Sequence, residues 1–149
     1  MTQSEFEALL QDTSKKIVGD IVWAEDEDRS PSVQFRGDLI SDSGYPLLVK
    51  GSYNEAARTL TFVLIHRAIG CIYRLDMGKD HHNPSCSRVG DVHKHRWTEQ
   101  FWDKEAYAPK DITAPVTSPV EVWKQFCQEA SIVHSGIMHA PPAQQSDLF

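Results

Sequence analysis

The stretch TLTFVLIHRAIGCIYRL, residues 59–75, decides the fold. It contains two apolar, β-branched runs, residues 59–65 and 69–75, and a connection of only three residues separates them. Runs of this length and composition are typical of strands that pack in a core. A parallel connection needs a crossover of about a dozen residues or more, so the short connection predicts that the two strands pair antiparallel.

Shorter strand signals lie on both sides of this stretch. Residues 33–39 alternate apolar and polar side chains up to a turn at 41–44, and residues 47–49 resume extended structure. Residues 21–23 and 92–97 predict two more short strands. Because most connections between these strands are short, we predict an antiparallel meander rather than a parallel sheet with helical crossovers.

A helix is predicted at the N-terminus. Ser4 and Glu7 have the spacing of a capping box, and Gly19 is a natural stop. Apolar side chains and one threonine recur at helical intervals, namely Phe6, Leu9, Leu10, Thr13 and Ile17.

A second helix is predicted near the C-terminus, where Ser118 is the expected N-cap, Pro119 the first helical residue and Glu121 the partner in a capping box. Its apolar face consists of Val122, Trp123, Phe126, Cys127, Ala130 and Val133. The sequence therefore predicts an α+β fold, in which an antiparallel β-sheet packs against an N-terminal and a C-terminal amphipathic helix.

Size and composition are those of an ordinary globular domain. With 149 residues, 40% hydrophobic and 24% charged, the chain is expected to form one domain over residues 1–140, followed by a flexible tail at 141–149. The formal net charge of −6 gives the protein as a whole no electrostatic footprint for wrapping a phosphate backbone. A local basic patch around Arg88, Lys94 and Arg96 remains open.

The location is predicted from segments that the sequence lacks. The N-terminus has no basic and apolar signal segment, and no stretch approaches the roughly 20 apolar residues of a spanning helix. The three cysteines form no CxxC pair or disulfide framework. We therefore expect a cytoplasmic protein of a bacterium or phage, without a membrane partner.

Histidines gather between the predicted strands. His81, His82, His93 and His95 fall within fifteen residues, near Asp76 and Glu99. Side chains two residues apart on a strand point to the same face, so His93 and His95 are expected to lie side by side. Neutral imidazole ligates transition metals, and its pKa near neutrality suits it to proton transfer.

One interpretation of this cluster is a divalent transition-metal site. His93 and His95, with Glu99 or His82, offer two imidazoles and a third ligand. The spacing H-x-H-x-x-x-E from His93 to Glu99 resembles the first motif of cupins, a resemblance that implies a metal held in a small β-barrel. It covers seven residues and lacks the opening glycine and the second cupin motif.

A second interpretation is metal-free acid–base chemistry on a phosphodiester. His82, His93 and His95 are the candidate acids and bases, and Arg74 is the candidate catalytic cation, with Lys94 or Arg96 as alternatives. Trp97 or Trp102 would stack a base. This interpretation predicts a toxin-like ribonuclease, or a nucleotide- or phosphodiester-processing enzyme, with RNA as partner.

Residues 74–109 also resemble a small bacterial and phage family of unknown function. The similarity rests on Arg74-Leu-Asp76, His82-Asn83-Pro84 and the segment from Gly90 to His95, followed by Ala106-Tyr107-Ala108-Pro109. It implies that Arg74, His82, Asn83, His93 and His95 belong to one structural constellation, and it implies no activity. Ala108 interrupts the Tyr-Pro pair of that pattern.

Two further interpretations stay open. The histidines have a purely structural role in the first, as turn formers and hydrogen-bond partners. In the second, the protein is a non-catalytic acidic interaction protein, such as a phage-encoded inhibitor of a nucleic-acid-processing defence enzyme, and it binds through the acidic run 25–28 and Trp102.

Overall fold

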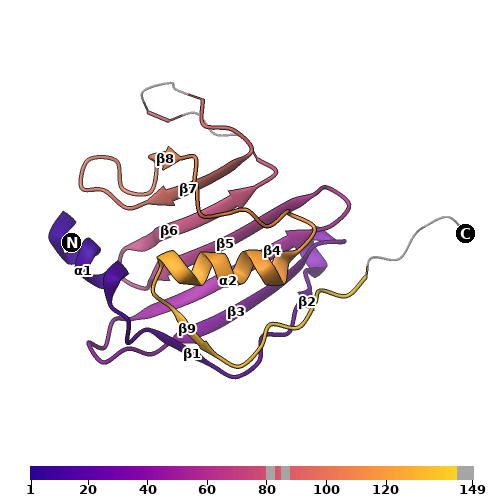
Figure 1. Cartoon of the computed structure of the whole chain (residues 1–149), viewed down its shortest axis with the longest axis horizontal. Helices are drawn as coiled ribbons and strands as arrows, with labels where there is room; N and C mark the ends of the chain where they lie inside the picture. The colour runs from indigo at the N-terminus through magenta and orange to yellow at the C-terminus, as the bar shows by residue number, and fades with distance from the viewer. Residues whose placement is uncertain (80–82, 85–87, 144–149) are drawn as a thin grey trace, which may run out of the picture.

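The computed structural model describes residues 1–79, 83–84 and 88–143, and its main element within these residues is a seven-stranded sheet (Figure 1). The strand order follows the sequence from β2 to β8, and every neighbouring pair is antiparallel. The fold is thus α+β, and the predicted meander is confirmed. The strands are β2 (Ala24–Glu25), β3 (Val33–Leu39), β4 (Leu47–Asn54), β5 (Thr59–His66), β6 (Gly70–Met77), β7 (Val92–Arg96) and β8 (Ala106–Tyr107).

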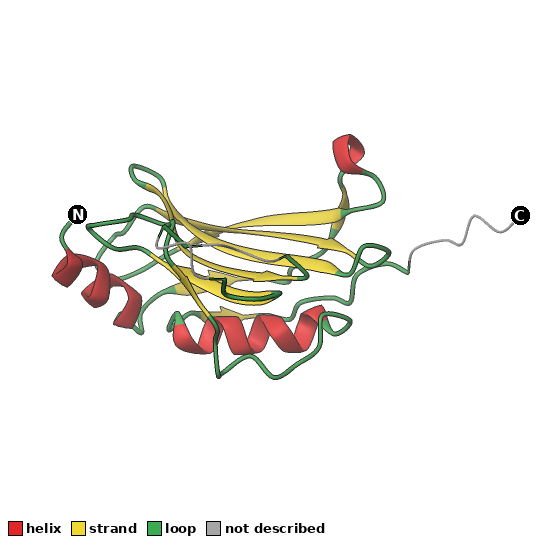
Figure 2. Ribbon diagram, turned by 90° about the horizontal axis from the view of Figure 1, so that it is seen from above, coloured by secondary structure: helices red, strands yellow, loops and turns green. Residues whose placement is uncertain are grey.

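Helix α2 (Pro119–Glu129) lies across one face of this sheet (Figure 2). Ser118 and Pro119 occupy the predicted N-cap and first helical positions, but the Ser118 side chain forms no capping hydrogen bond, and Glu121 pairs with Lys124 instead of completing the predicted capping box. The Phe62 ring of β5 packs against Trp123 and Phe126 of the helix, with ring centroids 5.2 and 5.6 Å apart. Aromatic contacts of this kind therefore hold the helix on the sheet. Among the described residues, no helix is long and apolar enough to cross a membrane.

Helix α1 (Gln3–Gln11) is shorter than predicted. Its N-cap is Thr2 rather than Ser4, because the Thr2 hydroxyl accepts a hydrogen bond from the Glu5 backbone N–H at 3.1 Å. The helix stops at Gln11 because Asp12 adopts an extended conformation and its carboxylate accepts a hydrogen bond from the Ser14 N–H at 2.8 Å. This local turn replaces the last helical turns that the apolar spacing predicted.

The segment predicted to end the first helix instead forms a strand. Strand β1 (Lys16–Val18) pairs in parallel with β9 (Val133–Ser135), a segment whose first residue was predicted to lie on the second helix. Both strands contain β-branched residues, which favour extended structure once a partner strand is available. That partner comes from the other end of the chain, so neither strand could be recognised from its own neighbourhood.

The predicted strand at residues 21–23 is displaced. Ile21 and Trp23 are buried as expected, but the strand itself, β2, covers Ala24–Glu25. The acidic run 25–28 continues into a short 3₁₀ helix, η1 (Glu27–Arg29), which has no buried residue. The run is therefore the solvated turn that its composition indicates.

Lys15 closes the C-terminal end of helix α1. Its side chain is fully buried, and Nζ donates hydrogen bonds to the carbonyl oxygens of Leu9, Leu10 and Asp12 at 2.7, 2.9 and 2.6 Å. The last carbonyls of a helix have no partner within the helix itself. Lys15 therefore supplies a donor to three carbonyls at this end of the helix, of which the Leu9 carbonyl also accepts from the Asp12 N–H at 3.3 Å.

We expect Lys15→Met to lower the free energy of unfolding by about 2 kcal/mol, because buried hydrogen bonds to a charged donor are lost together. Urea unfolding followed by circular dichroism measures the change. Lys16→Met is the control, since Lys16 is the exposed neighbour and its replacement should change stability by less than about 0.5 kcal/mol. Equal losses in the two variants would contradict this role of Lys15.

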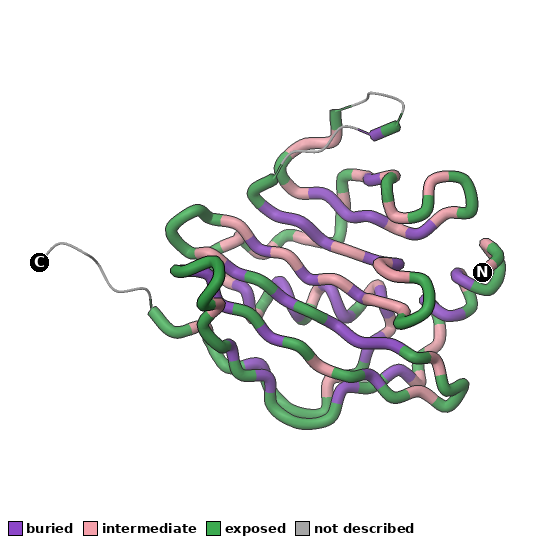
Figure 3. The backbone as a smooth tube through the Cα atoms, turned by 180° about the vertical axis from the view of Figure 1, so that it is seen from behind, coloured by how far each residue is buried: buried purple, intermediate pink, exposed green. Residues whose placement is uncertain are grey.

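Strand alternation gives β6 and β7 two chemically different faces. Tyr73 points toward α2 and stacks on Phe126 at 5.0 Å, and Lys94 points the same way, with Nζ 3.2 Å from the Glu129 carboxylate. The neighbouring residues on each strand must point to the opposite face. Figure 3 shows the resulting changes between buried and more exposed residues along the strands of the sheet.

Candidate metal site

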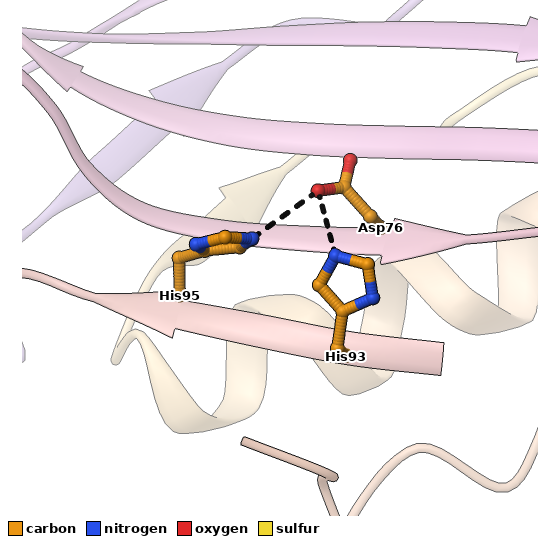
Figure 4. Close-up of side chains that lie close together, drawn as sticks. All are labelled: Asp76, His93 and His95. Atoms are coloured by element: carbon orange, nitrogen blue, oxygen red, sulfur yellow. Dashed lines mark ion pairs between the residues drawn. The ribbon is translucent and has the colours of Figure 1, made fainter. Parts of the chain in front are cut away.

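Strands β6 and β7 bring four polar residues together on the sheet face opposite α2. Three of the four are residues of the predicted site. In the register of this pair, Asp76 lies opposite His93 and Arg74 lies opposite His95. The two imidazoles and the Asp76 carboxylate point toward one another (Figure 4). Antiparallel pairing thus turns two i, i+2 patterns on separate strands into one cluster.

The ligand atoms of this cluster have the spacing of a small metal site. Oδ2 of Asp76 lies 3.3 Å from Nε2 of His93 and 3.6 Å from Nε2 of His95, and all three ligand atoms lie within 4.8 Å of one another. Two atoms bound about 2.1 Å from a tetrahedral ion lie about 3.4 Å apart. The group could therefore hold a metal ion without a large rearrangement.

The cluster is buried. Asp76, His93 and His95 are 6%, 2% and 1% exposed, so water contributes little to their solvation. Arg74 lies at the boundary, with 30% of its side chain exposed. Polar groups that are buried to this extent need hydrogen-bond or ionic partners. The loss of any contact in the cluster would therefore cost a large part of the desolvation free energy of these groups.

Backbone carbonyl oxygens orient both imidazole rings. Nδ1 of His93 lies 3.1 Å from the carbonyl oxygen of Gly90, and Nδ1 of His95 lies 2.7 Å from that of Asp103. A carbonyl oxygen only accepts hydrogen bonds, so each of these contacts is a hydrogen bond when Nδ1 of the ring carries the proton. The Nε2 atoms then face Asp76. Metal-binding histidines are commonly held in this way by a backbone carbonyl.

Arg74 is the cation nearest the cluster. Its Nε lies 3.0 Å from Oδ2 of Asp76, and its Nη2 donates to Nε2 of His95 at 3.1 Å. Because a guanidinium group cannot accept hydrogen bonds, Nε2 of His95 must be an unprotonated acceptor. The guanidinium therefore contacts two of the three atoms that face the centre of the cluster.

Electrostatics hold two of the three groups in their metal-binding forms. Burial by itself raises the pKa of Asp76, but hydrogen bonds from His93 and Thr61 and the charge of Arg74 outweigh it, so the pKa of this carboxyl lies well below its usual value. Burial, reinforced by the charge of Arg74, lowers the pKa of His95 to about 4. At neutral pH Asp76 is therefore a carboxylate and His95 a neutral imidazole.

The structure brings together His93, His95 and Arg74 of the predicted site residues, and it places Glu99 elsewhere. The Glu99 carboxylate accepts a hydrogen bond from the backbone N–H of Gln3 in helix α1. The carboxylate beside the two imidazoles is that of Asp76, which lies on a different strand. His82, the other candidate, lies outside the described residues, as do His81, Cys86 and positions 144–149 of the expected tail.

Asn83 supports the cluster from the side. It is 8% exposed, and its amide group donates to the carbonyl oxygen of Ala106 at 2.8 Å and accepts from the Ala106 N–H at 2.7 Å. Ala106 lies opposite His95 in the sheet. The Asn83 amide thus satisfies the free edge of the short strand β8 as another strand would.

The comparison with known proteins gives a family and no activity. The model of a family of unknown function, DUF6978, matches residues 1–132, a range that includes both helices and all the residues of the cluster. No curated protein and no solved structure matches the chain. This agrees with the resemblance to an uncharacterised family. The open sheet, with β2 and β8 at its edges, differs from the small barrel that the cupin resemblance implies. The chain belongs to the DUF6978 family of unknown function.

Proposed function

We propose that this protein binds one divalent transition-metal ion through Asp76, His93 and His95. The observation that carries the proposal is the convergence of Nε2 of both rings on one oxygen of Asp76, at 3.3 and 3.6 Å, while a backbone carbonyl takes Nδ1 of each ring. Three atoms that can all donate lone pairs then face a common point.

The number of protons available on the His93 ring supports a cation between the three ligand atoms. A neutral imidazole has a single N–H, and at His93 that proton serves either the Gly90 carbonyl or the Asp76 carboxylate. If one ring nitrogen donates its proton to one of these oxygens, the other ring nitrogen has no proton. It then faces the second oxygen, which can also only accept a hydrogen bond. Either a second proton on the ring or a metal ion at Nε2 removes this conflict, and a metal ion satisfies His95 and Asp76 at the same time.

The ligand set favours borderline metals. Two imidazoles and one carboxylate suit Zn²⁺, Fe²⁺, Co²⁺ and Ni²⁺, whereas Mg²⁺ and Ca²⁺ prefer sites made of oxygen ligands. Three protein ligands leave at least one coordination position open. Because Arg74 contacts Oδ2 of Asp76 and Nε2 of His95, we expect its guanidinium to withdraw when the ion enters.

Burial makes the metal-free alternative the weaker one. Acid–base chemistry on RNA requires the histidine rings to touch the substrate, and His93 and His95 are 2% and 1% exposed. Nδ1 of both rings also lies against a backbone carbonyl oxygen. RNA processing and the binding of a partner through the acidic run 25–28 stay predictions, and neither carries the present proposal.

The test is a titration of the chelator-stripped protein with metal ions by isothermal titration calorimetry. We expect one Zn²⁺ or Co²⁺ ion per chain and no measurable binding of Mg²⁺. At a free metal concentration of about 100 Kd, the ion should stabilise the fold by about 2.7 kcal/mol, which raises Tm by about 5–10 °C. Absence of a one-to-one binding event, or equal binding of Mg²⁺, would overturn the proposal.

A further inference from the structure

The sheet face opposite α2 is open over strands β3, β4 and β5. Figure 2 shows α1 and α2 on one side of the sheet and η1 rising from the other. A shallow depression of about 670 Å³ lies on the η1 side. Its floor comes from the three strands, and one wall carries Asp26, Asp28 and Arg29. This face therefore offers a concave surface that the described helices leave uncovered.

Two exposed cations lie next to each other on the floor of this depression. Arg36 on β3 is directly opposite Lys50 on β4, and both line the depression. Within residues 1–79, 83–84 and 88–143, neither forms an ion pair, whereas the nearby Arg67 is paired with Asp38 at 2.6 Å. Like charges directly opposite on neighbouring strands destabilise a sheet, so the pair is unfavourable unless an anion covers it.

The two cations begin a row that crosses the sheet to the candidate metal site. Lys50 lies opposite Val63, Val63 opposite Arg74, and Arg74 opposite His95. At about 4.8 Å between neighbouring strands, the row from Arg36 to Arg74 spans about 14 Å. Its positive groups are thus spread along a line rather than gathered around one point.

An exposed aromatic residue adjoins in sequence the residue that contacts His95 at the far end of the row. The carbonyl of Asp103 receives the hydrogen bond from His95, and the preceding residue, Trp102, is 57% exposed. Lys104 lies over the Trp102 ring, with Nζ 5.4 Å from its centroid. Large exposed rings of this kind are platforms on which nucleic-acid bases stack.

We propose that this face binds a single strand of nucleic acid, with its phosphates along the row Arg36, Lys50, Arg74 and a base on Trp102. In proteins that bind single strands, a line of cations contacts the phosphates of the strand and an exposed aromatic ring stacks on a base. An isolated phosphate needs convergent donors instead. Asp26 and Asp28 line the same depression and repel phosphates, so the strand is expected to lie over the row itself and away from these carboxylates. The overall charge of −6 disfavours non-specific binding of nucleic acid elsewhere on the surface.

This inference goes beyond the proposed metal binding and does not rest on it. Arg36 and Lys50 lie outside the metal cluster, so their replacement leaves all three ligands in place. The binding measurement is made in the presence of a chelator. Failure of the strand to bind then says nothing against the metal site, and failure of metal binding says nothing against this surface.

The experiment measures fluorescence anisotropy of labelled twelve-nucleotide strands of uridine and of deoxythymidine in low salt. We expect both to bind the wild-type protein, and the double variant Arg36→Glu, Lys50→Glu to bind at least about tenfold more weakly. Loss of two phosphate contacts should also make the slope of log K against log salt shallower by about 1.4. The milder variant Arg36→Gln, Lys50→Gln should show a smaller loss in the same direction.

The control is the double variant Lys16→Glu, Lys124→Glu, which has the same net charge as the first variant. Lys124 lies on α2, on the covered face of the sheet, and Lys16 lies on β1. Its only expected effect is the general repulsion that the more negative net charge causes. The control should therefore bind the strands within about twofold of the wild type. The proposal is overturned if the wild type does not bind either strand, if the control loses as much affinity, or if polyglutamate or inorganic phosphate displaces the strand at equal charge concentration.

Discussion

His93→Ala is expected to abolish stoichiometric metal binding. Loss of an outer hydrogen-bond partner of a metal ligand typically costs roughly 10–100-fold in affinity, and loss of the ligand itself should exceed that range. Asp76→Asn should also weaken binding strongly, because it keeps the shape of the side chain and removes the negative charge. Calorimetric titration with Zn²⁺, together with the metal-induced rise in Tm, measures both effects.

Arg74→Gln is expected to have the opposite effect on metal affinity. The Arg74 guanidinium contacts Oδ2 of Asp76 and Nε2 of His95, so it competes with an incoming cation for the same atoms. Its removal should tighten metal binding. A purely structural cluster gives no reason for a variant to gain affinity, so this variant separates the two roles.

His139→Ala is the matched control for the ligand variants. His139 also contacts a carboxylate, Asp20, at 3.0 Å, but both side chains are about half exposed. Its replacement should leave metal affinity unchanged, and so should Glu99→Gln, which alters the carboxylate that hydrogen-bonds to Gln3. If His93→Ala and His139→Ala bind metal equally well, the assignment of the ligands is wrong.

Lys94→Met is expected to cause the largest loss of stability in the chain. Lys94 is fully buried, and its Nζ lies 2.5 Å from Asp111 and 3.2 Å from Glu129, which also accepts hydrogen bonds from Tyr73 and Tyr107 at 2.7 Å each. Removing the buried cation leaves two carboxylates, which are 37% and 31% exposed, without their partner. The loss should be about 3 kcal/mol, or about 10 °C in Tm.

The pH dependence of this loss follows from Glu129. Burial by itself raises the pKa of Glu129, but hydrogen bonds from Tyr107 and Tyr73 and the charge of Lys94 outweigh it and lower the pKa. A lowered pKa in the folded state gives stability above the unfolded value of about 4.3, and this stability is lost as the pH falls further. The difference in unfolding free energy between wild type and Lys94→Met should therefore narrow as the pH falls from about 5 to 3.

A second lysine–glutamate pair provides the control. Lys124 and Glu121 are 3.1 Å apart on α2, with side chains 66% and 62% exposed. Exposed pairs contribute about 0–1 kcal/mol, so Lys124→Met should change stability by less than about 0.5 kcal/mol. Adding Glu129→Gln to Lys94→Met should recover part of the loss. Equal effects of the two lysine replacements would refute the buried network.

Local signals in the sequence were sufficient for much of the fold. The apolar runs around residues 59–75 predicted two antiparallel strands because short connections leave no other pairing, and the Ser118-Pro119 start predicted α2. The same signals misplaced the end of α1. The apolar spacing at Ile17 is compatible with a helix or a strand. The strand forms because β9, which begins at residue 133, pairs with this segment.

The candidate site shows the same division. The sequence by itself determined that His93 and His95 share a strand face, since strand side chains alternate with a period of two. Only the tertiary structure decided the third member of the cluster. Glu99 has the expected spacing, but a bridge between Thr98 and Trp102 turns the chain after β7, and the Glu99 carboxylate binds Gln3 instead.

Asp76 enters the cluster through strand register, which is set by long-range pairing of β6 with β7 rather than by distance along the chain. Burial is likewise a property of the assembled fold, because it depends on what the rest of the chain places over each residue. Composition and periodicity therefore determined the strands, the second helix and the histidine pair. The packing of distant segments decided which carboxylate faces the histidines and how deeply all three are buried, because contacts between distant residues leave no local pattern in the sequence.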